Sequence, residues 1–213
     1  MQISLLNVVP DFIEKEKIAG SQVWGQNLII NKGEHLHIVA PSGSGKTSLM
    51  HFIYGLRKDF SGTISYGDIQ IKKLSTESFS SFRKNKISII FQDLRLFPAL
   101  TVRENLEIKR LLDPYHPASI IEKMAERLGI LSKLDKPAKT CSYGEQQRIV
   151  IIRALLQPFD FLLLDEPYSH LDEANRNKAT QLIYEECEKR NGAMVFADLK
   201  ELDFFKSEKV VML

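Results

Sequence analysis

A loop rich in glycine and serine joins an apolar run to a helix-forming segment, and it constrains the fold more than any other part of the sequence. The apolar run HLHIVA ends at Ala40, the loop APSGSGKTS spans 40–48, and the segment KTSLMHFIY begins at Lys46. In such an arrangement, backbone N–H groups and the helix N-terminus point at anionic oxygens. The stretch therefore predicts a phosphate-binding P-loop and a nucleotide site.

The residue types in this loop suit a bound triphosphate. Gly43 and Gly45 let the backbone wrap closely around phosphates, since a side chain there would block the approach or forbid the dihedral angles. Lys46 brings a mobile positive charge to the β- and γ-phosphates, and Thr47 offers a hydroxyl to Mg²⁺. The usual pattern begins with glycine, so Ala40 fits only if that position has a negative φ. The predicted nucleotide-binding residues of the loop are Ser42, Gly43, Ser44, Gly45, Lys46, Thr47 and Ser48.

Composition indicates one ordinary globular domain spanning 1–213. The chain has 213 residues, is 44% hydrophobic and carries a net charge of only +2, which does not suggest a nucleic-acid partner. Cys141 and Cys187 are isolated in sequence, so they indicate neither a disulfide framework nor a zinc site, and they fit a reducing compartment. No apolar run approaches the roughly 20 residues that span a bilayer. Any membrane role is therefore expected to come from a partner.

The remaining pattern predicts an α/β fold. Its expected features are a mixed, largely parallel core sheet, an N-terminal antiparallel β subdomain and an inserted helical subdomain at about 95–156. Short apolar or β-branched runs predict strands at 3–9, 28–31, 36–39, 62–66, 69–71, 86–92 and 161–167. Capping and breaking residues predict helices from Lys46 to about Gly55, over 75–86, from Thr101, from Pro117 to Gly129, from Ser142 and over 173–190. Residues 193–213 are expected to form a strand, a short helix and a strand.

Three further positions are candidates for chemistry. Gln92 ends a predicted strand, where open α/β sheets place their ligands, although a polar residue facing water is the simpler alternative. Asp165 and Glu166 follow four apolar residues. Beside a P-loop, one such carboxylate commonly holds Mg²⁺ and the other orients or deprotonates an attacking water. Residues 142–145 have the spacing of a capping box, which by itself indicates only a well-capped helix.

Taken in order, these motifs resemble the ATP-binding subunit of an ABC transporter, and the resemblance covers nearly the whole chain. The matching segments are 40–48 (Walker A), Gln92 (Q-loop), 141–148 (the signature usually written LSGGQQQR), 161–167 (Walker B) and 169–172 (D-loop). The resemblance implies ATP and Mg²⁺ as ligands. It makes Glu166 the catalytic glutamate, assisted by Gln92 and Lys46. It also places Mg²⁺ on Thr47, Gln92 and Asp165.

In that family each ATP lies between two subunits. The resemblance therefore implies that Ser142, Gly144 and Glu145 contact the ATP held by a second subunit, with a homodimer expected and a mixed pair left open. Phe12 is the nearest candidate to stack on adenine and Trp24 the next. A core or surface aromatic is an equally good interpretation of Phe12.

The sequence departs from the family pattern at several positions. Cys141 and Tyr143 replace the leucine and first glycine of the signature, and Glu145 replaces a glutamine. Alignment of MVFADL with the strand that usually precedes the switch histidine puts Ala197 in its place. A methyl group cannot donate to the γ-phosphate, and loss of one oriented donor typically lowers the rate about 10²- to 10³-fold. Slow hydrolysis is therefore expected.

The resemblance implies an ATPase subunit that energises a membrane transporter. It would be cytoplasmic and peripheral at the inner face of the cell membrane, and would contact an integral membrane permease through residues 92–100 and the helical segment after them. The short chain is similar to the subgroup serving lipoprotein release, macrolide export and cell division. The alternative is a non-transport, nucleotide-gated clamp that signals to a membrane partner. A DNA-repair ATPase of this family would carry long insertions, which the sequence lacks.

Overall fold

The computed structural model describes residues 1–213, the side chain of Lys15 excepted, and contains two sheets. The antiparallel sheet has the order β2-β1-β4-β5 and comprises β1 (Gln2–Pro10), β2 (Asn27–Asn31), β4 (Phe60–Tyr66) and β5 (Ile69–Gln70). The second sheet has the order β6-β7-β8-β3-β9 and comprises β3 (His35–Val39), β6 (Ile87–Ile90), β7 (Phe161–Asp165), β8 (Ala193–Asp198) and β9 (Lys209–Met212). Every pairing in this second sheet is parallel, so the core sheet is more uniform than the mixed sheet expected.

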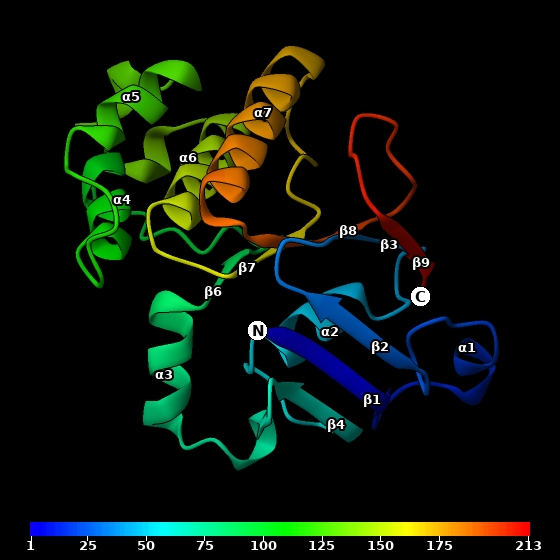
Figure 1. The fold of residues 1–213 in the computed structure, drawn as a ribbon. Helices are drawn as coiled ribbons and strands as arrows, with labels where there is room; N and C mark the ends of the chain where they lie inside the picture. The colour runs from blue at the N-terminus through cyan, green and yellow to red at the C-terminus, as the bar shows by residue number, and fades with distance from the viewer.

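Seven α-helices surround the sheets in the described chain. They are α1 (Lys15–Ala19), α2 (Lys46–Ile53), α3 (Thr76–Asn85), α4 (Val102–Arg110), α5 (Ile120–Arg127), α6 (Tyr143–Leu155) and α7 (Glu173–Arg190). In Figure 1, α4 to α7 lie above the parallel strands, and α2 lies below them with the antiparallel sheet. The parallel sheet is therefore the middle layer, buried on both faces, as its continuous apolar strands require. None of the described helices is long and apolar enough to cross a membrane.

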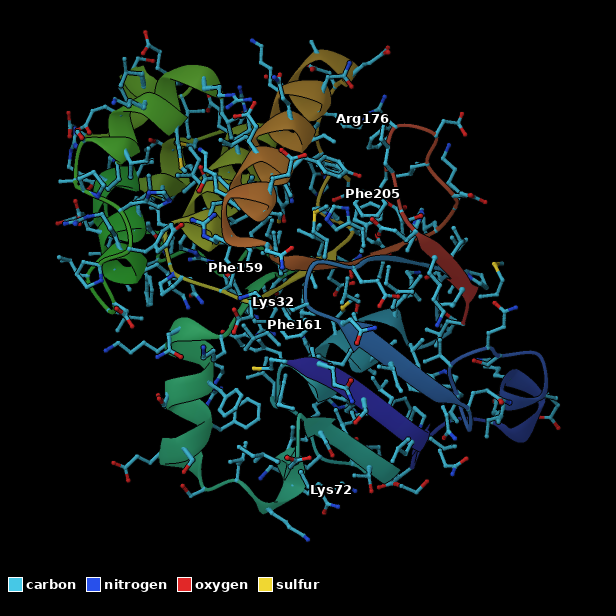
Figure 2. The ribbon with its side chains drawn as sticks, in the orientation of Figure 1. Lys32, Lys72, Phe159, Phe161, Arg176 and Phe205 are labelled. Atoms are coloured by element: carbon cyan, nitrogen blue, oxygen red, sulfur yellow. The ribbon has the colours of Figure 1, made fainter. Side chains whose placement is uncertain are left out.

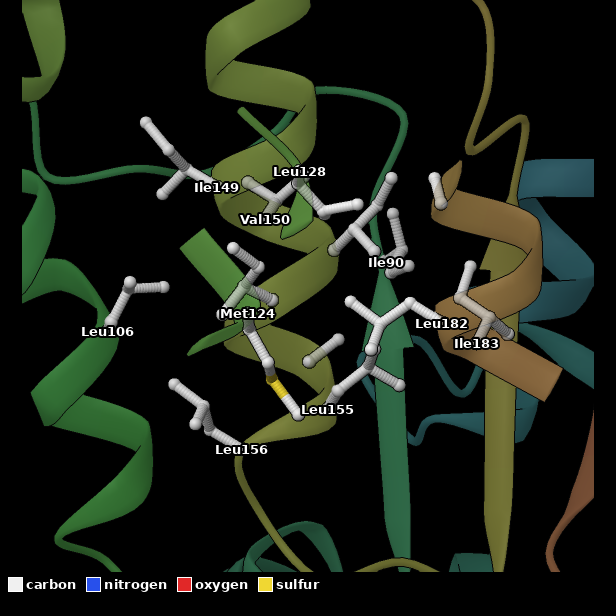
Figure 3. Packing of buried hydrophobic residues seen from close by; sticks show 14 of the residues in the cluster. Ile90, Leu106, Met124, Leu128, Ile149, Val150, Leu155, Leu156, Leu182 and Ile183 are labelled. Atoms are coloured by element: carbon white, nitrogen blue, oxygen red, sulfur yellow. The ribbon is translucent and has the colours of Figure 1, made fainter. Parts of the chain in front are cut away.

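Alternation along β7 and β8 connects the two halves of the core. Leu162 and Leu164 belong to the cluster under α4 to α7, whereas Phe161 and Leu163 belong to the cluster that α2 and the antiparallel sheet complete. This is the period of two that a strand imposes on its side chains. Figure 3 shows part of the first cluster around Ile90 of β6.

Most of the predicted elements are confirmed. Both capping boxes form, at Thr101–Glu104 before α4 and at Ser142–Glu145 before α6. Helix α5 begins at Ile120 rather than near Pro117. Helices α4 to α6 do occupy 95–156, but their buried side chains share one cluster with β7 and β8. The division into a helical subdomain remains a prediction.

The short helix predicted between the last two strands is wrong, because residues 199–208 form bends, one turn and irregular backbone. Aromatic packing anchors this segment instead. The ring of Phe205 stacks on Phe196 with 4.5 Å between centroids and meets His37 edge-on at 5.4 Å. Figure 2 shows Phe205 on this segment, between β8 and β9. Burial of one large ring therefore outweighs the weak helical propensity of the surrounding residues.

Candidate nucleotide-binding site

The P-loop joins β3 to α2 through backbone conformations that need glycine. Gly43 and Gly45 have φ of 75° and 102°, in the left-handed region that disfavours side chains. A Cβ on Gly45 would also lie 3.1 Å from the ring of Trp24. Ala40 is absent from the positive-φ residues of the described chain, so alanine fits the first position.

Lys46 is buried against the loop from which it projects. Only 5% of it is exposed, and its Nζ donates to the carbonyl oxygens of Ala40 at 2.9 Å and Pro41 at 3.2 Å. The same nitrogen lies 3.4 Å from Oε1 of Glu166. A positive charge is therefore held over the loop in a poorly solvated place, where its attraction for a phosphate is stronger than in water.

A continuous line of polar contacts joins α2 to the ends of β6 and β7. The Thr47 hydroxyl donates to Oε1 of Gln92 at 3.4 Å, and Nε2 of Gln92 donates to Oε2 of Glu166 at 3.1 Å. The ion pair between Glu166 and Lys46 adds the neighbour of Thr47 in the chain, so these four residues form one contact network. Gln92 lies two residues beyond the end of β6, so the four predicted residues meet at the carboxyl edge of the parallel sheet.

Asp165 is a buried acid without a compensating partner. The residue is fully buried, and both carboxylate oxygens lack hydrogen-bond partners among the described residues. Burial raises the pKa of Asp165 to about 6, and the nearby charge of Glu166 adds to this rise. The side chain of Thr47 and the charge of Lys46 lower the pKa, but by less. A buried carboxylate in this condition is stabilised by a cation.

The oxygen donors beside Asp165 suit Mg²⁺. A pocket brings together Thr47, His51, Gln92, Asp93 and Asp165. A hydroxyl, an amide oxygen and a carboxylate are the hard oxygen ligands that Mg²⁺ takes beside a bound phosphate. The predicted set of Thr47, Gln92 and Asp165 therefore fits this metal.

Glu166 adopts a strained backbone conformation at the end of β7. Its φ is 47°, and its N–H donates to the carbonyl oxygen of Ala197 in β8 at 3.0 Å. A non-glycine residue in this region costs about 1–3 kcal/mol, and such strain clusters at functional sites. The turn directs the Glu166 carboxylate toward Lys46 and Gln92.

A second pocket collects most of the predicted residues. Its lining is Phe12, Ser42, Gly43, Gly45, Lys46, Thr47, Ser48, Gln92 and Glu166. Phe12 is 52% exposed, whereas Trp24 is fully buried and donates to the carbonyl oxygen of Ser44 at 3.2 Å. Only Phe12 can therefore serve as a platform for a base.

Arg57 is a residue beside this pocket that no sequence motif indicates. Its guanidinium lies 4.6 Å from the centre of the Phe12 ring and donates to the Ser48 hydroxyl at 3.1 Å. Arg57 follows the P-loop helix α2 in the chain, and its guanidinium packs against one face of the Phe12 ring. The sequence offers no signal for this contact, because 45 positions separate Arg57 from Phe12.

The signature residues do not line either of these pockets. Ser142 and Glu145 cap α6 reciprocally, with Ser142 Oγ accepting from the Glu145 N–H at 3.3 Å and Glu145 Oε2 accepting from the Ser142 N–H at 2.7 Å. A Cβ on Gly144 would lie 2.9 Å from the carbonyl oxygen of His170. Tyr143 is 62% exposed, and its ring meets His170 edge-on at 4.5 Å. One chain alone therefore leaves this helix N-terminus open to solvent.

Ala197 lies next to the predicted Mg²⁺ ligand Asp165 in the parallel sheet. It is fully buried and stands opposite Asp165 in the register of β7 and β8, so the two side chains point to the same face of the sheet. The next residue, Asp198, ends β8 and is half-buried. The slow hydrolysis expected from a methyl group at the switch position remains a prediction.

Comparison with known proteins agrees with this geometry. A family model described as ABC transporter matches residues 24–169. The lipoprotein-releasing system ATP-binding protein LolD of Legionella pneumophila is 33% identical over 89% of this chain and 85% of the relative. The thiamine import ATP-binding protein ThiQ of Haemophilus ducreyi is 33% identical over 76% of this chain and 75% of the relative.

Solved structures show the same fold. A dimeric post-hydrolysis state of the ATP-binding cassette MJ0796 bound to ADP and Pi superposes with a TM-score of 0.81 at 25% identity, covering 93% of this chain and 88% of the other. A second dimeric structure of MJ0796 gives a TM-score of 0.77 at 28% identity over the same shares of both chains. With the matching family model, these likenesses show that the chain belongs to the ABC transporter family, as an ATP-binding and ATP-hydrolysing subunit that drives transport.

Proposed function

We propose that this chain binds MgATP in the P-loop pocket and hydrolyses it when a second, identical protomer closes over the nucleotide. The observation that carries the proposal is the contact network of Thr47, Gln92, Glu166 and Lys46 beside the unpaired carboxylate of Asp165. This network provides a cation for the phosphates, an oriented acid and oxygen ligands for Mg²⁺. Such a site acts mainly by positioning and by neutralising charge.

Each residue of the P-loop pocket would have a separate task in ATP hydrolysis. Lys46 leaves its carbonyl partners to neutralise the β- and γ-phosphates, while Glu166 accepts a hydrogen bond from the attacking water. Gln92 fixes the Glu166 carboxylate through its amide. Thr47, Gln92 and Asp165 would hold Mg²⁺, which when bound neutralises charge on the phosphate oxygens. Phe12, backed by Arg57, offers its exposed face to adenine.

The second protomer would supply the N-terminus of α6. In one chain Ser142 and Gly144 lie apart from the P-loop pocket, and a helix N-terminus with free N–H groups favours an anion. The dimeric MJ0796 structures support a pair of this kind. In the closed pair, Ser142 and Gly144 would contact the γ-phosphate and Glu145 would keep the cap intact.

The partner in the membrane would be an integral permease at the inner face of the cell membrane. Phe97 and Leu111 are exposed by 52% and 61%, on the loop before α4 and at the end of that helix. Exposed apolar side chains of this size are typical of contact surfaces. LolD and ThiQ are named as parts of a releasing and an import system, which supports a transport role but does not identify the cargo.

Three measurements on the purified protein test the proposal. We expect saturable MgATP binding, loss of that binding in Lys46→Ala, and ATP-dependent dimerisation of the slow variant Glu166→Gln in size-exclusion chromatography. Gln181→Ala, an exposed change on α7, is the matched control. Absence of saturable binding by the wild-type chain would refute the proposed function. A Glu166→Gln protein that binds ATP but stays monomeric at every concentration would refute the shared site.

A clamp that signals through dimerisation rather than turnover is the second candidate. The altered signature and the alanine at position 197, where the family pattern has a histidine, favour it, because loss of a donor to the γ-phosphate would slow turnover. Co-purification with a permease, together with steady-state ATPase activity, supports transport. Dimerisation with negligible turnover and without a permease supports the clamp.

A further inference from the structure

Arg153, in the last turn of α6, holds the loop that carries Gln92. Its Nη1 donates to the carbonyl oxygen of Arg95 at 2.7 Å, and its Nη2 donates to the carbonyl oxygen of Leu94 at 2.8 Å. Both side-chain hydrogen bonds of Arg153 within the described chain therefore end on this loop. Burial lowers the pKa of Arg153 to about 10, so the guanidinium is still charged at neutral pH, and hydrogen bonds from a charged donor are the strong ones.

Leu94 and Arg95 adopt a backbone conformation that needs such a hold. Their φ angles are 58° and 50°, so two consecutive residues with side chains lie in the left-handed region. Such conformations persist only where the surrounding structure determines them. The Arg95 N–H donates to the carbonyl oxygen of Asp93 at 2.6 Å, so the chain turns sharply directly after Gln92. The rigid fork of Arg153 fits the two adjacent carbonyl groups that this turn presents.

Helix α2 holds the same loop from the other face of the parallel sheet, as the placement of α2 and α6 in Figure 1 shows. The Phe91 ring meets the rings of His51 and Tyr54 edge-on, with 5.8 Å and 5.7 Å between centroids. Gln92 thus projects from a short segment that is fixed by Phe91 to α2 and by Arg153 to α6. Because the segment is short, loss of either hold moves the Gln92 amide relative to the hydroxyl and the carboxylate that it contacts.

We propose that Arg153 is a positioning residue, which aligns Gln92 for ATP hydrolysis by holding the loop after β6. The proposal rests on the proposed function of the nucleotide pocket, in which Gln92 orients Glu166. Arg153 and Ser142 lie at opposite ends of α6, whose 13 residues span about 20 Å. The helix that would present Ser142 to the ATP of the second protomer therefore also fixes the glutamine of its own pocket.

A change of Arg153 tests this role in the full chain. Arg153→Met keeps an apolar stem and removes both donors. Single-turnover hydrolysis of radiolabelled MgATP is expected to slow about 10- to 100-fold, while the dissociation constant for MgATP changes less than about threefold. In a Gln92→Ala protein the same change should slow hydrolysis less than about twofold, because Arg153 acts through that amide. Slowing by the full factor in both backgrounds would overturn the proposal.

Hydrogen exchange gives a second readout that requires no catalysis. In nucleotide-free protein, Arg153→Met is expected to speed exchange of the Leu94 and Arg95 amides at least about fivefold. The N–H groups of these residues donate within the loop, to Phe91 and Asp93, and the loop opens more often once its carbonyl groups lose their donor. Unchanged exchange in a folded Arg153→Met protein would also overturn the proposal.

Two further variants separate the hold on the loop from general stability. Arg153→Lys keeps the charge but has no fork, so it is expected to restore part of the rate. Arg103→Met removes an arginine of α4 that pairs with Glu122 and, at 3.0 Å, with Asp135, and it should leave both readouts at their wild-type values. Equal slowing by Arg103→Met and Arg153→Met would show a loss of stability and refute the positioning role. If the wild-type chain neither binds nor hydrolyses MgATP, the proposed function fails, and the exchange rates alone decide whether Arg153 holds the loop.

Discussion

Gln92 donates a hydrogen bond from Nε2 to Oε2 of Glu166 over 3.1 Å, and this bond joins the loop after β6 to the end of β7. Gln92 is exposed and Glu166 is half-buried in a strained turn. The amide therefore fixes the direction of a carboxylate whose backbone is already held by β8. Through Thr47, the same amide is also connected to the start of α2.

Gln92→Ala is expected to reduce turnover more than nucleotide affinity. The change removes the amide that orients Glu166, and the loss of such an orienting partner typically lowers activity about 10- to 100-fold. Steady-state ATPase kinetics, with direct measurement of MgATP binding, would show this pattern. Gln181→Ala should leave both quantities unchanged. A Gln92→Ala protein with wild-type kcat would disprove the orienting role.

Asp165→Asn is expected to stabilise the metal-free protein while weakening Mg²⁺-dependent nucleotide binding. The pKa of Asp165 is raised from 3.8 to about 6, so this carboxyl contributes stability below pH 3.8 that is lost as the pH rises through about 6. The loss corresponds to at most about 3 kcal/mol at neutral pH. Urea unfolding in EDTA at pH 4.5 and 7.5 measures it, and Asp203→Asn is the control. Equal pH dependence in wild type and Asp165→Asn would contradict the prediction.

His37→Leu is expected to raise the free energy of unfolding by about 1–3 kcal/mol. His37 is fully buried against Phe196 and Phe205, and neither ring nitrogen has a hydrogen-bond partner among the described residues. Leucine has a similar volume and no polar atoms to desolvate. Thermal and urea unfolding at pH 7.5 check the gain, with the half-buried His35→Leu as the comparison.

The imidazole of His37 also makes the free energy of unfolding fall as the pH is lowered. Burial lowers the pKa of His37 below 6.5 in the folded protein, so the unfolded chain takes up the proton first. The contribution of His37 to the free energy of unfolding is complete above pH 6.5. It is lost as the pH falls toward the pKa of His37 in the folded protein. In His37→Leu this part of the acid destabilisation should be missing. A variant that loses stability between pH 7 and 5 as steeply as wild type would refute the assignment.

The site was predictable where one short segment carries both the chemistry and the geometry. The P-loop needs Gly43 and Gly45 for their positive φ, and Asp165 with Glu166 must follow a buried strand. Such local requirements leave a pattern in the sequence. The fold class was predictable for the same reason, because apolar runs and capping boxes define most of the elements.

Contacts between distant segments were not predictable. Arg57 beneath Phe12 and the anchoring of the last loop by Phe205 depend on which surfaces meet after folding. The pairing of Ala197 with Asp165 is also a contact between distant segments, because it depends on the register of β8 against β7. The effect of a methyl group at this position on hydrolysis remains a prediction.

Tyr143→Ala is expected to strengthen ATP-dependent dimerisation several-fold, by about 1 kcal/mol, the scale of one unfavourable contact at the rim of an interface. The ring stands beside the capped N-terminus of α6, meets His170 edge-on at 4.5 Å and is 62% exposed, so it would occupy space that the partner's nucleotide needs. Sedimentation of the Glu166→Gln protein with MgATP, with and without the tyrosine change, gives the two dimer dissociation constants. Tyr115→Ala, at a 44% exposed ring outside the signature, is the matched control. A weaker dimer in Tyr143→Ala would show that the ring instead stacks favourably on the partner.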